Sequence, residues 1–168
     1  MINKRIEEAI NNQINAELWS AYLYLSMSLD CASKGLQGAA NWFDIQFQEE
    51  QAHALKFKNY LVARGAKVTL MPIAEVKTEW PSLLEIFKDT LHHEQKVTAL
   101  LNNIYKIALE ESDVATQSML KWFIDEQVEE EENANSMIDA LKMIGDNGYG
   151  LYMLDKELAT RVFVPIPA

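Results

Sequence analysis

Four glutamates stand in this sequence at positions where a helical bundle would place apolar side chains. Each has an apolar residue seven positions before it and another seven positions after it, and seven residues make nearly two turns of an α-helix. These glutamates are Glu17, Glu50, Glu94 and Glu130. Any one of them could reach solvent from the edge of an apolar stripe, but the set of four predicts carboxylates that face the interior of a bundle.

The neighbours of these glutamates supply no compensating charge. The positions three and four residues before and after each of them hold no Lys or Arg. A buried carboxylate costs on the order of several kcal/mol unless it is paired or protonated. Carboxylates that face one another must therefore share protons, with raised pKa values, or hold metal cations.

A histidine accompanies one of the four. His53 follows Glu50 by three residues, so both side chains lie on one face of a helix, one turn apart. Oxygen ligands with one imidazole favour iron or manganese over a thiolate type of site. The other two histidines, His92 and His93, have no glutamate at the matching position, and we expect them at the surface.

An internal repeat relates the two halves of the chain. Glu50 follows Glu17 by 33 residues, and Gln127 follows Glu94 by 33 residues. A shift of 77 residues superimposes Glu17 on Glu94, Glu49 on Glu126, Glu50 on Gln127 and His53 on Glu130. The repeat predicts a pseudo-twofold site, with one carboxylate from the first helix of each pair and a two-residue motif from the second.

The elements that must position these residues are long helices. The 6 Gly and 4 Pro leave long uninterrupted blocks. We expect helices over about residues 4–33, 39–64, 81–111 and 113–144, then a flexible break at 145–150 and a short fifth helix over about 151–162. Pro81 suits the first position of the third helix, and Ser112 or Asp113 suits the cap of the fourth.

These lengths predict an all-α fold in a single domain that covers residues 1–168. Each of the first four helices would span roughly 40 to 45 Å. Short connections join the helices within each pair, and the stretch 65–81 forms one long crossover between the second and third helices. A four-helix bundle with one such crossover is the ferritin-like topology.

Composition bounds the kinds of partner, cross-link and cellular location that this chain can have. The chain has 168 residues and a formal net charge of -10, without a cluster of Lys or Arg, which argues against nucleic acid or an anionic membrane as a partner. Cys31 is the only cysteine, which excludes an internal disulfide and a cysteine zinc site. No stretch approaches the ~20 apolar residues of a membrane span. We expect a cytoplasmic protein.

The motifs of this chain resemble those of bacterial non-haem ferritins over nearly its whole length. The resemblance rests on Glu17, QEEQAH (48–53), HHEQ (92–95), DEQVEEEE (125–132) and GLYMLDKEL (150–158). It implies an iron-storage protein that oxidises Fe(II) with O2 or H2O2 inside a 24-subunit homo-oligomeric shell. Leu151, Tyr152, Leu154, Leu158 and Val162 would then pack the last helix at contacts between subunits.

The resemblance also implies roles for individual residues. Glu17, Glu50 and His53 would bind a first iron, and Glu50 would bridge to a second iron held by Glu94 and Glu130. Gln127 would support the second iron by hydrogen bonding.

The resemblance also implies a third iron site, which maps onto Glu49, Glu126 and Glu129, with Glu130 shared. Separately from the resemblance, the bundle-facing positions of Tyr24 and Trp122 lead to the hypothesis that they supply an electron during turnover, with plain core packing as the alternative for each.

Differences from one related family, the bacterioferritins, argue against haem as a cofactor. A bacterioferritin would carry a second Glu-x-x-His on the fourth helix and a haem-binding Met directly after the bridging glutamate. This chain has Gln127 to Glu130 and Gln51 at those places, so haem is not expected.

Three alternative functions stay open: a ferritin-like di-iron oxidase or peroxidase without storage, a metal-free helical interaction module, and a storage cage with a damaged oxidation centre.

Overall fold

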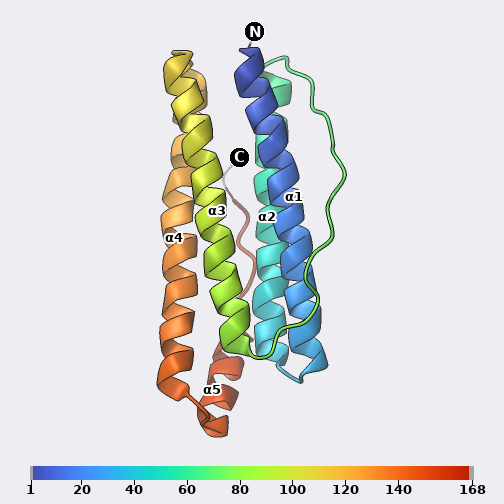
Figure 1. Ribbon diagram of the computed structural model, residues 1–168, viewed down its shortest axis with the longest axis vertical. Coiled ribbons are helices and arrows are strands. Elements are labelled where there is room, and N and C mark those ends of the chain that lie inside the picture. Colours follow the sequence, from blue (N-terminus) through green and yellow to red (C-terminus); the bar gives the residue numbers. More distant parts are fainter. Residues whose placement is uncertain (1, 167–168) are drawn as a thin grey trace.

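The computed structural model describes residues 2–166, in which five helices and no strand occur. The helices are α1 (Lys4–Ser33), α2 (Gln37–Ala63), α3 (Leu83–Glu110), α4 (Val114–Ile144) and α5 (Gly148–Leu158). The four long helices lie side by side, and α5 lies at one end of the bundle (Figure 1). The predicted all-α four-helix bundle with a short fifth helix is confirmed.

The connection between α2 and α3 runs along the bundle beside α1 (Figure 1). Side chains of α1 fix it at both ends. Asn11 accepts a hydrogen bond from the Thr69 amide at 2.7 Å, and the Ser26 hydroxyl donates to the Lys77 carbonyl at 2.7 Å. The connection returns the chain to the end at which α2 began, so α3 runs parallel to α2.

Capping side chains set where α3, α4 and α5 begin, and they correct two predicted helix starts. The Ser82 hydroxyl accepts from the Glu85 amide at 3.3 Å, so α3 begins at Leu83 rather than at Pro81. Asn147 accepts from the Gly150 amide at 3.0 Å. Residues 148–150 therefore belong to α5. At its other end, this helix stops at Leu158 and not at 162. Asp113, rather than Ser112, caps α4.

Helix α5 packs closely against the start of α2. Helix α2 begins at Gln37, two residues earlier than predicted, so Gly38 lies inside its first turn. A Cβ atom on Gly38 would lie 1.6 Å from the backbone oxygen of Asp155 in α5. The Asp155 carboxylate also accepts from the Ala39 amide at 2.9 Å. The absence of a side chain at position 38 is what allows the two backbones to approach.

Two apolar clusters fill the bundle, one on each side of its middle. One contains Tyr24, Phe43 and Phe87 together with residues of α5. The other contains Ile10, Phe57, Leu61, Leu101, Leu120 and Phe123. The residues that flank the four glutamates at steps of seven thus fall into different clusters, which places the glutamates between them.

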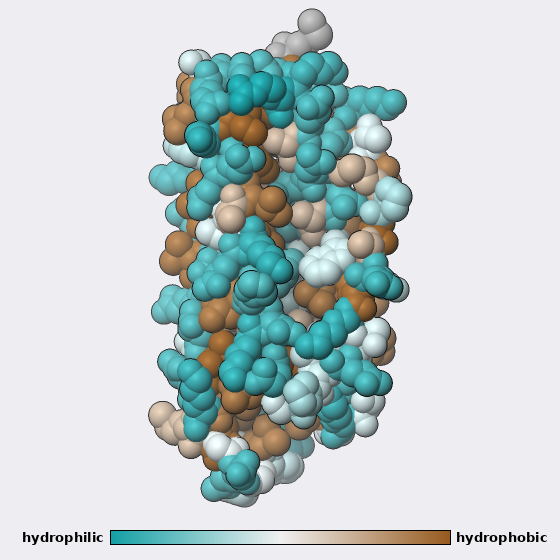
Figure 2. Space-filling view, in the orientation of Figure 1, coloured by the Kyte–Doolittle hydropathy of each residue, from teal (hydrophilic) through white to brown (hydrophobic). Residues whose placement is uncertain are grey.

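The outer surface mixes hydrophilic and hydrophobic side chains. On the face seen in Figure 2, hydrophilic residues predominate and hydrophobic ones show between them along the length of the bundle. Within residues 2–166, no helix is both long and apolar enough to cross a membrane.

Candidate metal centre

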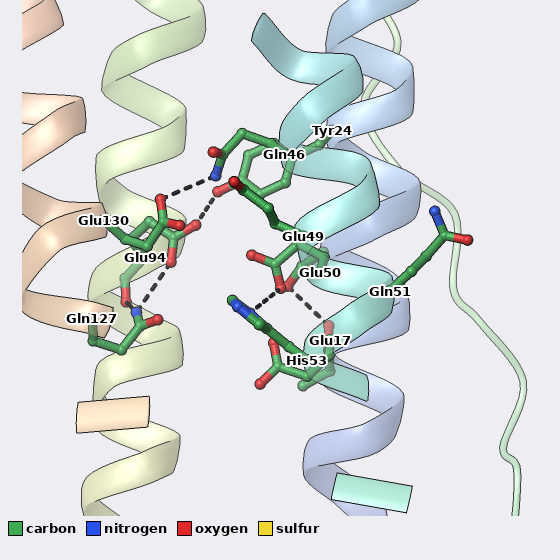
Figure 3. A network of polar contacts seen from close by, with 12 residues as sticks. Glu17, Tyr24, Gln46, Glu49, Glu50, Gln51, His53, Glu94, Gln127 and Glu130 are labelled. Carbon is green, nitrogen blue, oxygen red and sulfur yellow. Dashed lines mark hydrogen bonds and ion pairs between the residues drawn. The ribbon is translucent and has the colours of Figure 1, made fainter. Parts of the chain in front are cut away.

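The four glutamates lie at the middle of the bundle, one on each long helix, and we call them the carboxylate layer (Figure 3). Their exposed fractions are 1% for Glu17, 2% for Glu50, 0% for Glu94 and 7% for Glu130. The prediction that all four face the interior is confirmed by these values. Helical periodicity explains the placement, because each glutamate continues an apolar stripe.

The α1 and α2 half of the site brings together the three residues predicted for a first metal. One ligand atom each from Glu17, Glu50 and His53 lie within 4.8 Å of one another. His53 Nδ1 is 3.6 Å from Glu50 Oε2. Within the part of the chain that the structure describes, one oxygen of Glu17 and one of Glu50 are buried without a hydrogen-bond partner. Such orphaned carboxylate oxygens fit a cation better than they fit a packed core.

The α3 and α4 half is tied to the other half by hydrogen bonds. Tyr24 of α1 donates to Glu94, and the Gln127 side-chain amide donates to the other Glu94 oxygen at 3.0 Å. Gln46 of α2 donates to Glu130 at 3.0 Å. Gln127 thus contacts a predicted metal ligand, as the resemblance implies. Sequence reasoning missed Gln46, although its place one turn before Glu50 was a usable signal.

Burial is the main cause that raises the pKa of each carboxyl in the layer. The pKa values of Glu17 and Glu50 lie well above their ordinary range, because each carboxyl is also close to another one. Burial, followed by the charges of Glu94 and Glu49, raises the pKa of Glu130 to about 8. The layer therefore holds protons near neutral pH, and a bound cation would displace them.

Tyr24 is fully buried beside the layer. Its ring stacks on Phe43 with centroids 6.0 Å apart, and its hydroxyl donates to Glu94. Burial and the charges of neighbouring glutamates raise its pKa well above the ordinary value. Trp122 lies against His53, with its ring centroid 5.5 Å from that of the histidine. Tyr24 thus packs in the core, Trp122 is partly buried against the core, and both adjoin predicted ligands.

The three residues predicted for a third iron line one cavity of about 420 Å³. Glu49 and Glu126 are partly buried, Glu129 is exposed, and His53 forms the wall toward the carboxylate layer. Arg161, which follows α5, makes an ion pair with Glu49 at 2.7 Å. This partner lies 112 residues away in the sequence, so helical spacing could not have revealed it.

The expectation that His93 lies at the surface is wrong, whereas His92 is exposed as expected. His93 faces α1, where its Nε2 lies 2.7 Å from the Ser20 hydroxyl and its ring 5.2 Å from that of Trp19. Burial lowers the pKa of His93 to about 4, which keeps the ring neutral at pH 7. His93 is a core histidine with a hydrogen-bond partner.

Gln51, which follows Glu50, points away from the carboxylate layer (Figure 3). Its side-chain amide donates to the Phe47 carbonyl at 3.1 Å on its own helix. The position therefore contributes nothing to the layer, even though it adjoins the residue at the centre of the site.

Comparisons with known proteins find similar sequences and a similar fold. A family model described as a Ferritin-like domain matches residues 7–144. Proteins named "Bacterial non-heme ferritin" from Staphylococcus aureus (strain MRSA252) and Staphylococcus haemolyticus (strain JCSC1435) are each 42% identical over 163 residues, 97% of this chain and 98% of theirs. The crystal structure of an open pore ferritin from Archaeoglobus fulgidus is 42% identical with a TM-score of 0.96, and covers 96% of this chain and 100% of that one.

Proposed function

The chain belongs to the ferritin family, and on that premise we propose that it oxidises Fe(II) to Fe(III) at the carboxylate layer and stores the product as hydrous ferric oxide inside a homo-oligomeric shell. The observation that carries the proposal is the buried cluster of Glu17, Glu50 and His53, which Glu94 and Glu130 face from the other helix pair. A metal-free interaction module gives no reason for buried carboxylate oxygens that accept no hydrogen bond.

Two irons suit this ligand set. Glu17 and His53 would hold the first iron, Glu94 and Glu130 the second, and Glu50 would bridge them. Anionic oxygen ligands stabilise Fe(III) over Fe(II) and so favour oxidation. Each iron gives up one electron, and the pair of electrons reduces O2 with two protons to H2O2, or H2O2 with two protons to water. The protons that iron displaces from the carboxyls are available for this step.

The residues around the layer favour iron over an organic substrate. An oxidase that acts on an organic molecule needs space beside the metals. Phe43, Phe57, Phe87 and Phe123 flank the layer, and none is more than 2% exposed. Iron ions need no such space. The cavity that Glu49, Glu126 and Glu129 line is then a route for Fe(III) toward the mineral, with a third iron site on the way.

Assembly of a shell requires outward-facing residues on α5 or on the residues that follow it. Leu154 and Leu158, which were expected at subunit contacts, are buried within the chain itself. Tyr152 and Val162 are 56% and 72% exposed, so they are the residues of that set that a neighbouring subunit would cover. We expect such a shell, of about 24 subunits in the family's pattern, to work in the cytoplasm with O2 or H2O2 as the oxidant.

Stepwise anaerobic Fe(II) titration followed by exposure to O2 tests the proposal. The wild-type protein should bind two or three irons per chain and develop the absorbance of a ferric pair. Glu50→Ala and His53→Ala should slow oxidation by roughly 100-fold or more, because each removes a metal ligand whose position is fixed. Gln51→Ala is the matched control, because Gln51 points away from the layer. Wild-type rates in both ligand variants would reject the site.

A further inference from the structure

The chain does not end at α5 but turns back along the bundle. Residues 159–166, called here the C-terminal segment, run beside the long helices (Figure 1). Val162, Val164, Pro165 and Ile166 line the cavity that Glu49, Glu126 and Glu129 share. The segment therefore forms one wall of the predicted third iron site.

Arg161 fixes this wall to α2. Its guanidinium donates to Glu49 at 2.7 Å and to the Trp42 carbonyl at 3.2 Å, and it lies 4.4 Å from the centroid of the Trp42 ring. The Asn41 side chain donates to the Arg161 carbonyl at 3.0 Å. Both side chains of the ion pair are mostly buried, with exposed fractions of 23% for Arg161 and 18% for Glu49. The guanidinium is held by several contacts and not by the ion pair alone.

The charge of Arg161 matters because of where it lies. Of the residues within 2–166 that line this cavity, Arg161 alone carries a permanent positive charge, while three glutamates supply negative charge. A guanidinium-carboxylate hydrogen bond is among the stronger polar contacts in proteins. A metal ion can take the Glu49 oxygen that Arg161 holds only if it displaces the guanidinium or tolerates its repulsion.

We propose that Arg161 is a positioning residue that competes with iron for Glu49 and so keeps the third site weak, which lets iron pass from the carboxylate layer to the storage cavity instead of remaining bound. This inference rests on the proposed function. It assigns to the C-terminal segment a part in iron traffic, in addition to any part in assembly.

Binding of Zn(II), measured by titration calorimetry on the assembled protein, separates this role from the oxidation chemistry. In Arg161→Gln, the third Zn(II) should bind roughly 10-fold more tightly, because a charge-assisted competitor is gone, while the first two bind as in wild type. Arg161→Lys should stay within about 3-fold of wild type, because the positive charge that repels a metal ion remains. Arg64→Gln, which breaks an ion pair with Asp113 at 2.7 Å outside the site, is the matched control.

The results that would overturn the role of Arg161 differ from the result that would count against the proposed function. An unchanged third affinity in Arg161→Gln overturns the proposal, and so does an equal change in Arg161→Gln and Arg161→Lys, because a purely structural anchor would lose the guanidinium contacts in both. Should Arg161→Gln fail to assemble, tight third-site binding in Arg161→Lys would also overturn it. Failure of the wild type to bind the first two Zn(II) ions would instead count against the proposed function.

Discussion

At the scale of single residues, the free energy of burying charge governs the carboxylate layer. Glu17, Glu50, Glu94 and Glu130 are removed from water, and Lys and Arg do not appear among the hydrogen-bond and ion-pair partners of these four in the described chain. A cation stabilises their charged form, and protons do so in its absence. The same burial that suits the layer to a cation also makes the metal-free protein sensitive to pH.

Stability of the metal-free protein should fall as pH rises. The pKa of Glu130 is raised from its ordinary value of 4.5 to about 8, so between these values the folded chain holds a proton that the unfolded chain has lost. Unfolding then releases protons and becomes more favourable with increasing pH. Glu130→Gln should reduce this slope by up to about 1.4 kcal/mol per pH unit.

Denaturant unfolding in EDTA between pH 5 and pH 8 measures these slopes. Glu129→Gln is the control, because Glu129 is exposed next to the buried residue. Parallel curves for wild type and Glu130→Gln would show that Glu130 does not titrate in this range.

Tyr24 is placed to give up an electron and a proton together. Its hydroxyl already donates to Glu94, which can accept the proton when the ring is oxidised. We expect Tyr24→Phe to keep its fold and its iron stoichiometry, to slow the completion of oxidation several-fold and to lack a tyrosyl radical in freeze-quench spectra. Unchanged kinetics, with no radical in either protein, would leave Tyr24 a packing residue.

At the scale of elements, the junction between α2 and α5 depends on one missing side chain. Gly→Ala inside a helix usually stabilises it by roughly 0.5–1 kcal/mol. Gly38→Ala should instead destabilise the protein by about 1–3 kcal/mol, because its Cβ would overlap the Asp155 backbone oxygen. Thermal unfolding and the assembly state report the effect. Gly148→Ala, whose Cβ would meet nothing within 4 Å, should be nearly neutral, and equal effects of the two changes would contradict this reading.

At the scale of the whole molecule, the carboxylate layer joins two helix pairs. Helix α1 packs mainly on α2 and α3 mainly on α4, and the polar contacts from Tyr24 to Glu94 and from Gln46 to Glu130 cross between the pairs. The proposed metal centre, with ligands from all four helices, would add a further link across this boundary.

Zn(II) should therefore stabilise the folded chain, and EDTA should reverse the effect. At about 100 times the dissociation constant, one bound ion contributes about 2.7 kcal/mol. Glu94→Gln should lose a large part of the increase in melting temperature, because one helix pair then offers a weaker ligand. Differential scanning calorimetry at pH 7 measures the increase. An equal increase in both proteins would show that the ions do not link the pairs.

The sequence by itself determined the four long helices, the crossover between α2 and α3, and the four inward glutamates with His53. These follow from periodicity and spacing along one helix, which are local properties. Helix ends are less well determined by the sequence. At α3, for example, Pro81 and the capping hydroxyl of Ser82 are neighbouring residues that both indicate a helix start.

Only the tertiary structure decided which side chains meet across helices. It placed Gln46 on Glu130, Ser20 on His93 and Arg161 on Glu49, at separations of 84, 73 and 112 residues. The first two pairings depend on the rotation of one helix against another, and the third on a segment that turns back after α5. No local pattern encodes such relations, because they arise only when the bundle closes and buries its apolar faces.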